Sequence, residues 1–409
     1  MTAYLKDYEE IAGAAAVNDL RALAGWVRSR RCQHINSTSV GGEVAAILTR
    51  LVPLMRELGV ETSWDVIKGD EDFLAATRAL SLALEGRAGV FTEAMRQSYL
   101  ATMEMNLQEF QFGGDVVFVH DPQPAGLIVK KREIGRRWVW RSHLDLSEPD
   151  EAAWSFFSPL LEGFDASIFS MPDFAQPSSL PQFVIPPSID PLGDRNRDLE
   201  PDQVRAIMER HQIDPARPVI MQVARLDRLK DPIGVLAVYR LIKPRHDCQL
   251  VIIGDNAVYD QDSLNLLSEL QPQAEDDPDI HVLALPPFSD LEINGLVRGA
   301  TVVVHKPIRE GFGLAVSEAM WKKKPVVGSA VGGVKRQIVN GHTGFLVHSA
   351  EEAALRVSQL LADPDMRAAM GENGREHVRH NFLVTRQLED YLLLLLALDY
   401  PDKDVVFLA

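Results

Sequence analysis

The sequence predicts an α/β protein of two domains, each built around a parallel β-sheet. Short β-branched and apolar runs alternate with longer amphipathic segments along the chain, as strands and helices do in parallel sheets. A proline-rich stretch, Pro186 to Gly193, divides this alternation into two sets. At 409 residues the chain also exceeds one ordinary hydrophobic core. We therefore expect two Rossmann-like domains facing a central cleft, a common place for a ligand site.

Six strands are expected in each domain. In the first set the strand-like runs are residues 33–37, 62–67, 116–120, 138–143, 166–170 and 183–185, and helices are expected at about 43–58, 72–84, 92–110 and 151–161. In the second set the strand-like runs are residues 219–223, 249–253, 281–285, 301–305, 325–328 and 345–347, again separated by helix-like segments. The resulting domain bounds are 1–193 and 194–385, and residues 386–409 form a C-terminal helix and tail.

The composition excludes several classes of partner. The net charge of −16 disfavours non-specific binding to nucleic acid and to anionic membranes. Cys32 and Cys248 are far apart and suggest no disulfide framework, which fits a reducing cytoplasm. The first ten residues lack the basic and apolar regions of a signal peptide. The apolar run Leu392–Leu396 is too short to cross a bilayer. We expect a cytoplasmic protein. The sequence leaves its oligomeric state open, a homodimer included.

The segment Glu310 to Glu318, E-G-F-G-L-A-V-S-E, is the first candidate binding site. It follows the β-branched run Thr301–His305 and so lies at the carboxyl end of a parallel strand, where open α/β sheets bind ligands. Gly311 and Gly313 let the backbone approach a ligand and leave amides free at a helix N-terminus, which suits phosphate or sugar oxygens. The competing interpretation is an acidic pair on a solvated helix.

A pair of cations follows the first strand of the second domain. Arg225 and Lys230 lie in the loop before a helix whose N-cap we expect at Asp231 and whose first residue we expect at Pro232. Two such cations can neutralise the charge that grows on a diphosphate leaving group. The alternative is a pair of solvated surface charges.

The first domain offers a glycine loop and two histidines at strand ends. Gly41 and Gly42 precede a helix and either bring amides to a phosphate or form a tight turn without a ligand. G-x-G-x-x-G is absent there, which disfavours a dehydrogenase. His120 and His143 can each bind a sugar hydroxyl, although single histidines are often structural. Asp145 either binds an acceptor hydroxyl or caps the turn that follows it.

Two further charged motifs are interpreted as structural. Asp70-Glu71-Asp72 matches the D-x-D pattern that holds Mn²⁺ on nucleotide sugars, but it begins a helix, where carboxylates cap the N-terminus. The run Lys322–Lys324 ends a helix, where cations are favourable. We therefore expect neither motif to hold a metal or another cofactor.

Taken together, these residues resemble the retaining glycosyltransferases of family 4, over nearly the whole chain. The most specific parts of the match are Arg225 with Lys230, the Glu310–Glu318 loop, and Gly332-Gly333 followed by Ile338–Val347. Within that family the first half is most similar to the nucleoside-diphosphoglucose-dependent trehalose synthases, with the fungal-type trehalose phosphorylases close behind. The segments that carry this similarity are His34–Gly42, Val119–Ala125, Trp138–Ser147 and Pro186–Leu192. The resemblance implies the GT-B fold, with residues 386–409 crossing back to the first domain.

The resemblance also implies a role for each candidate in the second domain. Arg225 and Lys230 would hold the diphosphate of the donor, and Glu318 would bind its ribose hydroxyls. Glu310 would hold hydroxyls of the donor glucose. Three backbone amides would assist it, those of Phe312, Gly313 and Leu314.

In the first domain, the resemblance implies that His143 contacts the donor sugar near the reacting carbon and that Gly42 lines the phosphate. The implied mechanism is front-face substitution, in which the leaving phosphate oxygen helps to deprotonate the acceptor and the anomeric configuration is retained. This chemistry requires no metal. One departure concerns Glu43, which stands where relatives commonly carry a third glycine. A carboxylate there would repel a diphosphate unless it points away along the helix.

The implied partners are a nucleoside-diphosphate glucose as donor and glucose as acceptor, with α,α-trehalose as product. A trehalose phosphorylase is the close rival, and Glu318 disfavours it because a phosphorylase has no ribose to bind. Transfer to another sugar or polyol stays open, and so does the nucleobase, UDP-glucose and ADP-glucose included. A non-catalytic sugar-nucleotide binder is least favoured, since Arg225, Lys230 and Glu310 are all present.

Overall fold

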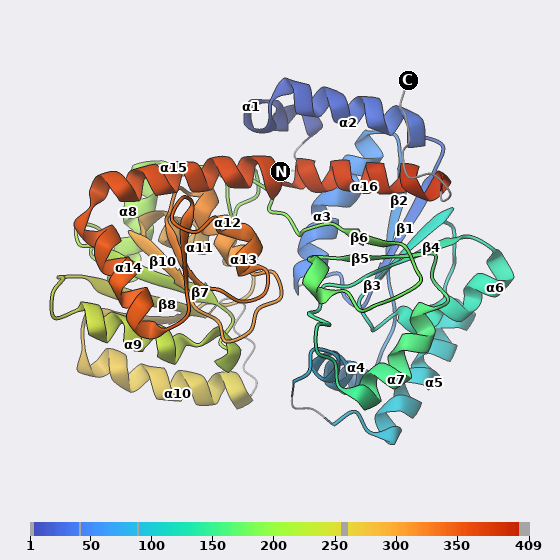
Figure 1. Ribbon diagram of the computed structural model, residues 1–409, viewed down its shortest axis with the longest axis horizontal. Coiled ribbons are helices and arrows are strands. Elements are labelled where there is room, and N and C mark those ends of the chain that lie inside the picture. Colours follow the sequence, from blue (N-terminus) through green and yellow to red (C-terminus); the bar gives the residue numbers. More distant parts are fainter. Residues whose placement is uncertain (1–3, 41, 88–89, 255–260, 401–409) are drawn as a thin grey trace. The chain divides into compact units, whose positions relative to one another are not determined.

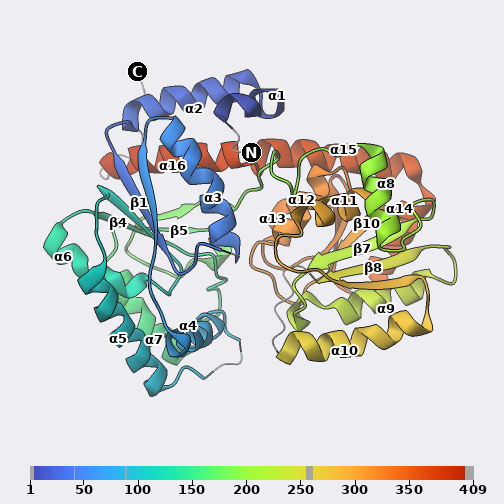
Figure 2. The same cartoon turned by 180° about the vertical axis from the view of Figure 1, so that it is seen from behind.

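The computed structural model describes residues 4–40, 42–87, 90–254 and 261–400, which form two compact α/β units (Figures 1 and 2). The first unit comprises Met1–Pro187 and Val384–Ala409, and the second comprises Ser188–Leu383. Each unit has a six-stranded sheet. The α/β class and the two parallel sheets predicted from the sequence are confirmed, whereas the cleft between the domains stays a prediction.

The first sheet has the strand order β2-β1-β3-β4-β5-β6, and all neighbouring strands are parallel. Its strands are β1 (Arg31–Asn36), β2 (Glu61–Val66), β3 (Val116–His120), β4 (Arg137–Arg141), β5 (Ala166–Phe169) and β6 (Gln182–Val184). The order reverses at β1, because β2 lies on one side of it and all later strands lie on the other. Open α/β sheets bind ligands outside the carboxyl ends of the strands at such a reversal.

Helices cover both faces of the first sheet. On one face, α16 (Val384–Asp399) packs against α2 (Ala14–Val27) and α3 (Gly42–Glu57), as Figure 1 shows. On the other face lie α4 (Glu71–Leu84), α5 (Glu93–Glu109) and α7 (Glu151–Leu161), over a core rich in aromatic side chains. The remaining short elements of this unit are α1 (Glu9–Ala12), α6 (Lys131–Ile134) and three 3-10 turns, Leu5–Tyr8, Ala125–Lys130 and Pro172–Phe174.

The second sheet has the strand order β12-β11-β10-β7-β8-β9, again with all neighbours parallel. Its strands are β7 (Val219–Ala224), β8 (Gln249–Gly254), β9 (Ile280–Ala284), β10 (Val302–His305), β11 (Val326–Ser329) and β12 (Gly344–Val347). This is the strand order of the dinucleotide-binding fold, and its reversal lies between β7 and β10. The segments that follow β7 and β10 are therefore the expected place for a ligand.

Helices also cover both faces of the second sheet (Figure 2). One face carries α9 (Pro232–Ile242), α10 (Gln261–Asp276) and α14 (Ala350–Ala362). The other carries α8 (Pro201–Arg210), α11 (Asp290–Gly299), α12 (Leu314–Trp321), α13 (Val334–Gln337) and α15 (Pro364–Asn381), and a 3-10 turn, Arg228–Lys230, precedes α9. Among the described residues, no helix is both long and apolar enough to span a bilayer.

The unit boundary lies earlier than the proline-rich stretch suggested, at Pro187 rather than residue 193. The reason is that the residues after Pro187 are bound to the second unit. Ile189 N–H donates to the carbonyl of Phe382 at 2.9 Å, and Asn196 Oδ1 accepts from Lys322 Nζ at 2.8 Å. Hydrogen bonds, rather than local composition, thus decide where the first unit ends.

We predict that two glycines of α15 differ sharply in their tolerance of a methyl group. A Cβ at Gly371 would lie 2.2 Å from the backbone oxygen of Lys323, whereas a Cβ at Gly374 meets its nearest atoms at 3.4 Å. Gly371→Ala should lower the free energy of unfolding by about 1–3 kcal/mol, because backbone must move. Gly374→Ala should leave it unchanged or raise it by up to about 1 kcal/mol through helix propensity. Denaturant titrations check this, and equal midpoints would contradict the packing described.

Candidate active site

Lys230 and Glu310, which were predicted at two separate strand ends, form an ion pair where the strand order of the second sheet reverses. Lys230 follows β7, Glu310 follows β10, and Lys230 Nζ donates to both Glu310 carboxylate oxygens, at 2.6 and 2.7 Å. The two loops are also joined by their backbones, since Ile308 N–H donates to the carbonyl of Leu229 at 2.8 Å. The pair is largely shielded, because the side chains are only 15% and 6% exposed.

Glu310 is held as a carboxylate by its surroundings. Burial alone would raise its pKa, but a hydrogen bond from His305 and the charge of Lys230 outweigh burial and lower the pKa to about 2. The His305 Nε2 atom lies 2.8 Å from the second carboxylate oxygen. Gln222 on β7 fixes the other partner, because its side-chain amide donates to the Lys230 carbonyl at 2.7 Å. Glu310 can therefore accept hydrogen bonds, but it cannot act as an acid near neutral pH.

The loop before α12 is shaped by glycines. Gly313 has a φ of 80° and caps α12, so Phe312 and Leu314 flank the start of the helix. Gly333 N–H donates to the Gly311 carbonyl at 2.7 Å, and the Gln337 side-chain amide donates to the Phe312 carbonyl at 2.6 Å. The carbonyls are thus occupied. Val316 N–H donates to the Gly313 carbonyl at 3.0 Å, while the amides before it lie at the helix start, where the chain offers no preceding turn of carbonyls. Such amides are suited to phosphate or hydroxyl oxygens.

The loop that contains Glu310 requires a glycine at position 332, in the segment that follows β11. A Cβ at Gly332 would lie 1.8 Å from the backbone oxygen of Glu310, so no other residue fits without moving the loop. This explains in physical terms why Gly332-Gly333 accompanies the Glu310 loop.

The other two charged candidates of this unit differ in their surroundings. Glu318 lies on α12 and accepts from Arg195 Nε at 3.0 Å, a partner that the sequence did not reveal. The Arg225 side chain is 69% exposed and lies 3.9 Å from the carboxylate of Asp227. Glu310 and Glu318 therefore have different cationic partners.

In the first unit the strand-end histidines form a row with a third one. His34 Nδ1 lies 3.0 Å from His120 Nε2, and His120 Nδ1 lies 3.4 Å from His143 Nε2. The three come from β1, the end of β3 and the segment after β4, which are neighbours in the sheet. His34 also stacks on Phe118, with ring centroids 4.7 Å apart. His34 was not a sequence candidate, because a single histidine inside a strand is often structural.

Two carboxylates approach the outer end of this row. Asp121, with a positive φ of 65°, accepts from the His143 backbone N–H at 2.7 Å. Glu43, in the first turn of α3, places Oε1 3.6 Å from His143 Nδ1. Gly42 begins α3 with a φ of 78°, as a close turn requires, whereas Gly41 lies outside the described residues.

The structural alternatives are visible for several sequence candidates. Asp145 accepts from both the backbone N–H and the hydroxyl of Ser147, at 3.0 and 2.6 Å, so it caps the turn that follows it. Asp70 caps α4 by accepting from Phe73 N–H at 2.8 Å, which confirms the capping interpretation of the D-x-D motif. Asp231 and Pro232 begin α9 as predicted. Lys322 is buried, and burial lowers its pKa to about 7.

Arg141 is a polar residue of this unit that sequence reasoning missed. It ends β4, is fully buried, and none of its three guanidinium nitrogens has a hydrogen-bond partner among the described residues. Its charge acts on His120 and Asp121, which lie at the neighbouring strand end. A buried charge without hydrogen bonds is costly, which marks this strand end as unusual.

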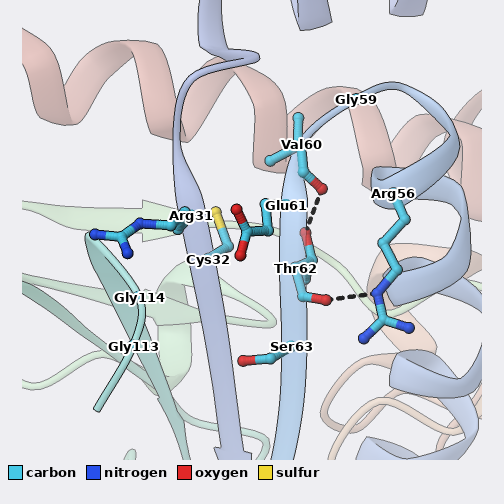
Figure 3. A pocket seen from close by; sticks show the side chains of 10 residues that line it. All are labelled: Arg31, Cys32, Arg56, Gly59, Val60, Glu61, Thr62, Ser63, Gly113 and Gly114. Carbon is cyan, nitrogen blue, oxygen red and sulfur yellow. Dashed lines mark hydrogen bonds between the residues drawn. The ribbon is translucent and has the colours of Figure 1, made fainter.

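A separate pocket of about 620 Å³ lies at the opposite, amino ends of β1 and β2 (Figure 3). Its lining consists of Arg31, Cys32, Arg56, Gly59, Val60, Glu61, Thr62, Ser63, Gly113 and Gly114. Burial raises the pKa of the Cys32 thiol to about 12, so this thiol stays protonated and is a poor nucleophile. None of the sequence-predicted site residues lines this pocket.

Comparisons with known proteins agree with both halves of this description. Residues 34–176 match the family described as trehalose synthase, N-terminal domain, and residues 203–377 match glycosyl transferases group 1. The chain is 41% identical to a trehalose synthase of Thermococcus litoralis, over 96% of each chain. It is 28% identical to a trehalose phosphorylase of Pleurotus pulmonarius, over 91% of this chain and 58% of that protein.

A solved structure supports the same fold. The E. coli trehalose-6-phosphate structure bound with UDP-2-fluoro glucose aligns with a TM-score of 0.70. The alignment covers 89% of this chain and 98% of that chain at 15% sequence identity. At this identity the likeness concerns the fold, and it agrees with the GT-B architecture.

We predict an acid-sensitive contribution of Glu310 to stability. Its pKa is about 2 in the folded protein against an ordinary value of 4.5, so its contribution is complete above pH 4.5 and is lost as the pH falls towards 2. The difference corresponds to about 3 kcal/mol. Between pH 5 and 2 the wild type should therefore lose about 3 kcal/mol more than Glu310→Gln. Denaturant unfolding at several pH values measures this, with the exposed Glu372→Gln as control. Parallel curves for wild type and Glu310→Gln would contradict it.

Proposed function

The chain belongs to the trehalose synthase family of glycosyltransferases, and we propose that it transfers glucose from a nucleoside-diphosphate glucose to glucose, forming α,α-trehalose with retention. That it is a hexosyltransferase follows from the family. The observation that carries the finer proposal is the cluster of Lys230, Glu310 and His305 in the loop that leads to the N-terminus of α12. It combines a cation for a diphosphate with a fixed acceptor for sugar hydroxyls.

In the free protein, Lys230 and Glu310 neutralise each other. When a donor binds, the Lys230 ammonium can donate a hydrogen bond to the leaving phosphate in place of one to Glu310. Negative charge grows on this phosphate as its bond to the glucose breaks. Glu310 then accepts from glucose hydroxyls through the oxygens that Lys230 releases. His305 keeps the carboxylate oriented throughout, because its contact with Glu310 Oε2 does not depend on Lys230.

We propose that retention results from front-face substitution. Glu310 is a poor candidate for acid–base work, since a carboxyl with a pKa of about 2 is a weak base. The leaving phosphate oxygen is then the natural base for the acceptor hydroxyl. The proposed reaction needs no metal, so a chelator such as EDTA should not reduce the rate.

Trehalose phosphorylase activity is the second candidate, and the relative from Pleurotus pulmonarius supports it. Two observations favour the nucleotide-dependent reaction. Glu318 is positioned on α12 with Arg195 and can exchange this partner for ribose hydroxyls. The family match in the first unit is to trehalose synthase, and the E. coli structure of the same fold binds a UDP-sugar analogue.

We predict that the protein releases nucleotide and forms trehalose when it is given glucose and a nucleoside-diphosphate glucose. The purified protein is incubated with ADP-, UDP- or GDP-glucose plus glucose, with and without EDTA, and both products are quantified. Trehalose should form with at least one donor and should not depend on the chelator. Phosphate-dependent cleavage of trehalose, without nucleotide release from any donor, would replace this proposal with the phosphorylase.

We also predict that Lys230→Ala lowers kcat/KM by at least ~10²-fold, because the leaving diphosphate loses its cation. Lys323→Ala is the matched control, since it removes a lysine of the same unit whose side chain is 49% exposed and pairs with Glu372. The control should retain the wild-type kcat/KM. Circular dichroism must show that both variants are folded. A folded Lys230→Ala with near-wild-type kinetics would remove Lys230 from the mechanism.

A further inference from the structure

The row of three histidines in the first unit consists of hydrogen-bonded rings, and the two inner rings, His34 and His120, are kept from charging. Burial lowers the pKa of His34 to about 3. Burial, followed by the charges of His34, His143 and Arg141, lowers the pKa of His120 well below its ordinary value. Both inner rings are therefore neutral near pH 7. A neutral imidazole has one N–H and one bare nitrogen, so each can donate once and accept once.

This chemistry forces the protons of the row to point in one direction. If His120 Nδ1 donates to His143, then His120 Nε2 is bare and must accept from His34 Nδ1. If instead His143 Nε2 donates, every proton is reversed. With one proton on each ring, two arrangements keep both hydrogen bonds, and they differ in what they leave at the two ends of the row.

The end groups decide between the two arrangements. In the first arrangement His143 carries its proton on Nδ1 and directs it at Glu43 Oε1, 3.6 Å away. At the inner end of the row, His34 Nε2 then carries no proton. This nitrogen is buried and has no hydrogen-bond partner in the described part of the chain. In the reversed arrangement a buried N–H is left without an acceptor, and a bare nitrogen faces a carboxylate. Both features are unfavourable, so the first arrangement is the stable one.

Other charged and titratable groups face the row without changing this result. Asp121 is engaged by the His143 backbone N–H rather than by an imidazole. Arg141, from β4, can only donate, and it acts on His120 through its charge. Tyr391, from α16, meets His34 edge-on at 5.9 Å between centroids. Among these groups Glu43 is the one whose carboxylate meets a ring nitrogen of the row.

We infer that Glu43 is a positioning residue that fixes His34, His120 and His143 as Nδ1–H tautomers. His143 Nδ1 is itself buried and faces Glu43, so its proton sets the orientation of the His143 ring at the carboxyl edge of the first sheet and does not meet a substrate directly. The tautomer assignment stands on the contacts of the first unit alone, whereas its effect on catalysis rests on the proposed function.

A simpler role for Glu43 makes a different prediction. A carboxylate in the first turn of α3 also stabilises the helix dipole, and Glu151 occupies the same kind of position in α7. A dipole effect would alter stability in both cases and would leave the histidine protons where they are. Glu151→Ala is therefore the matched control for Glu43→Ala.

The tautomers can be read directly by NMR on the full chain. Long-range ¹H–¹⁵N spectra of ¹⁵N-histidine-labelled protein show which ring nitrogen carries the proton, and single His→Gln variants assign the signals. The wild type and Glu151→Ala should show Nδ1–H for all three histidines. Glu43→Ala should shift all three histidines towards Nε2–H, because reversal at His143 reverses the whole row. An Nε2–H form of any of the three in the wild type, or unchanged spectra in Glu43→Ala, would overturn the inference.

Kinetics test the consequence for catalysis. Glu43→Ala should lower kcat by about tenfold or more, as loss of a carboxylate that orients a histidine typically does, with KM for the donor little changed. Glu151→Ala should keep the wild-type kcat. If the wild type shows the expected tautomers but no transfer to glucose, the proposed function fails and the tautomer assignment stands. If transfer occurs and Glu43→Ala matches Glu151→Ala, the positioning role is overturned.

Discussion

The reversal of strand order in each sheet is the constraint on which the candidate site depends. It brings together chain segments that are remote in sequence, because the carboxyl ends of β7 and β10 are neighbours, as are those of β1 and β3. Lys230 and Glu310 meet although they are 80 residues apart, and His34 meets His120 across 86 residues. Each unit therefore presents its chemically active side chains where ligands of open α/β sheets bind.

Burial then affects which side chains at the strand ends are charged, and the two units differ in this respect. In the second unit a buried carboxylate is given a lysine and a histidine, so it keeps a fixed charge beside a cation. In the first unit the buried imidazoles have no such partners and stay neutral, and burial likewise raises the pKa of Asp121. Fixed charges suit a diphosphate, whereas neutral hydrogen-bonding groups suit the hydroxyls of a sugar.

Most of the fold could be predicted from sequence, while the partners within the site could not. All twelve strands follow from short apolar runs with clear ends, and Lys230 and Glu310 follow from their position after such runs. Their ion pair depends on which strands are neighbours, and hydrophobic periodicity carries no information about that. His34 and Arg141 escaped notice because a buried polar residue inside a strand has the same neighbours in sequence as a core residue. The pairing of Glu318 with Arg195 likewise joins segments 123 residues apart.

Glu43 illustrates how a structural partner changes the role that is inferred for a residue. From the sequence it is a charge beside a glycine loop, where it would repel a diphosphate. In the structure its Oε1 atom is buried near His143 rather than directed along the outside of α3. A carboxylate in that place makes the Nδ1–H form of His143 favourable, and the neighbouring rings follow because each has one proton to give. The same charge that looks like an obstacle to phosphate binding can thus orient a histidine at a strand end, and the difference lies in what the carboxylate faces.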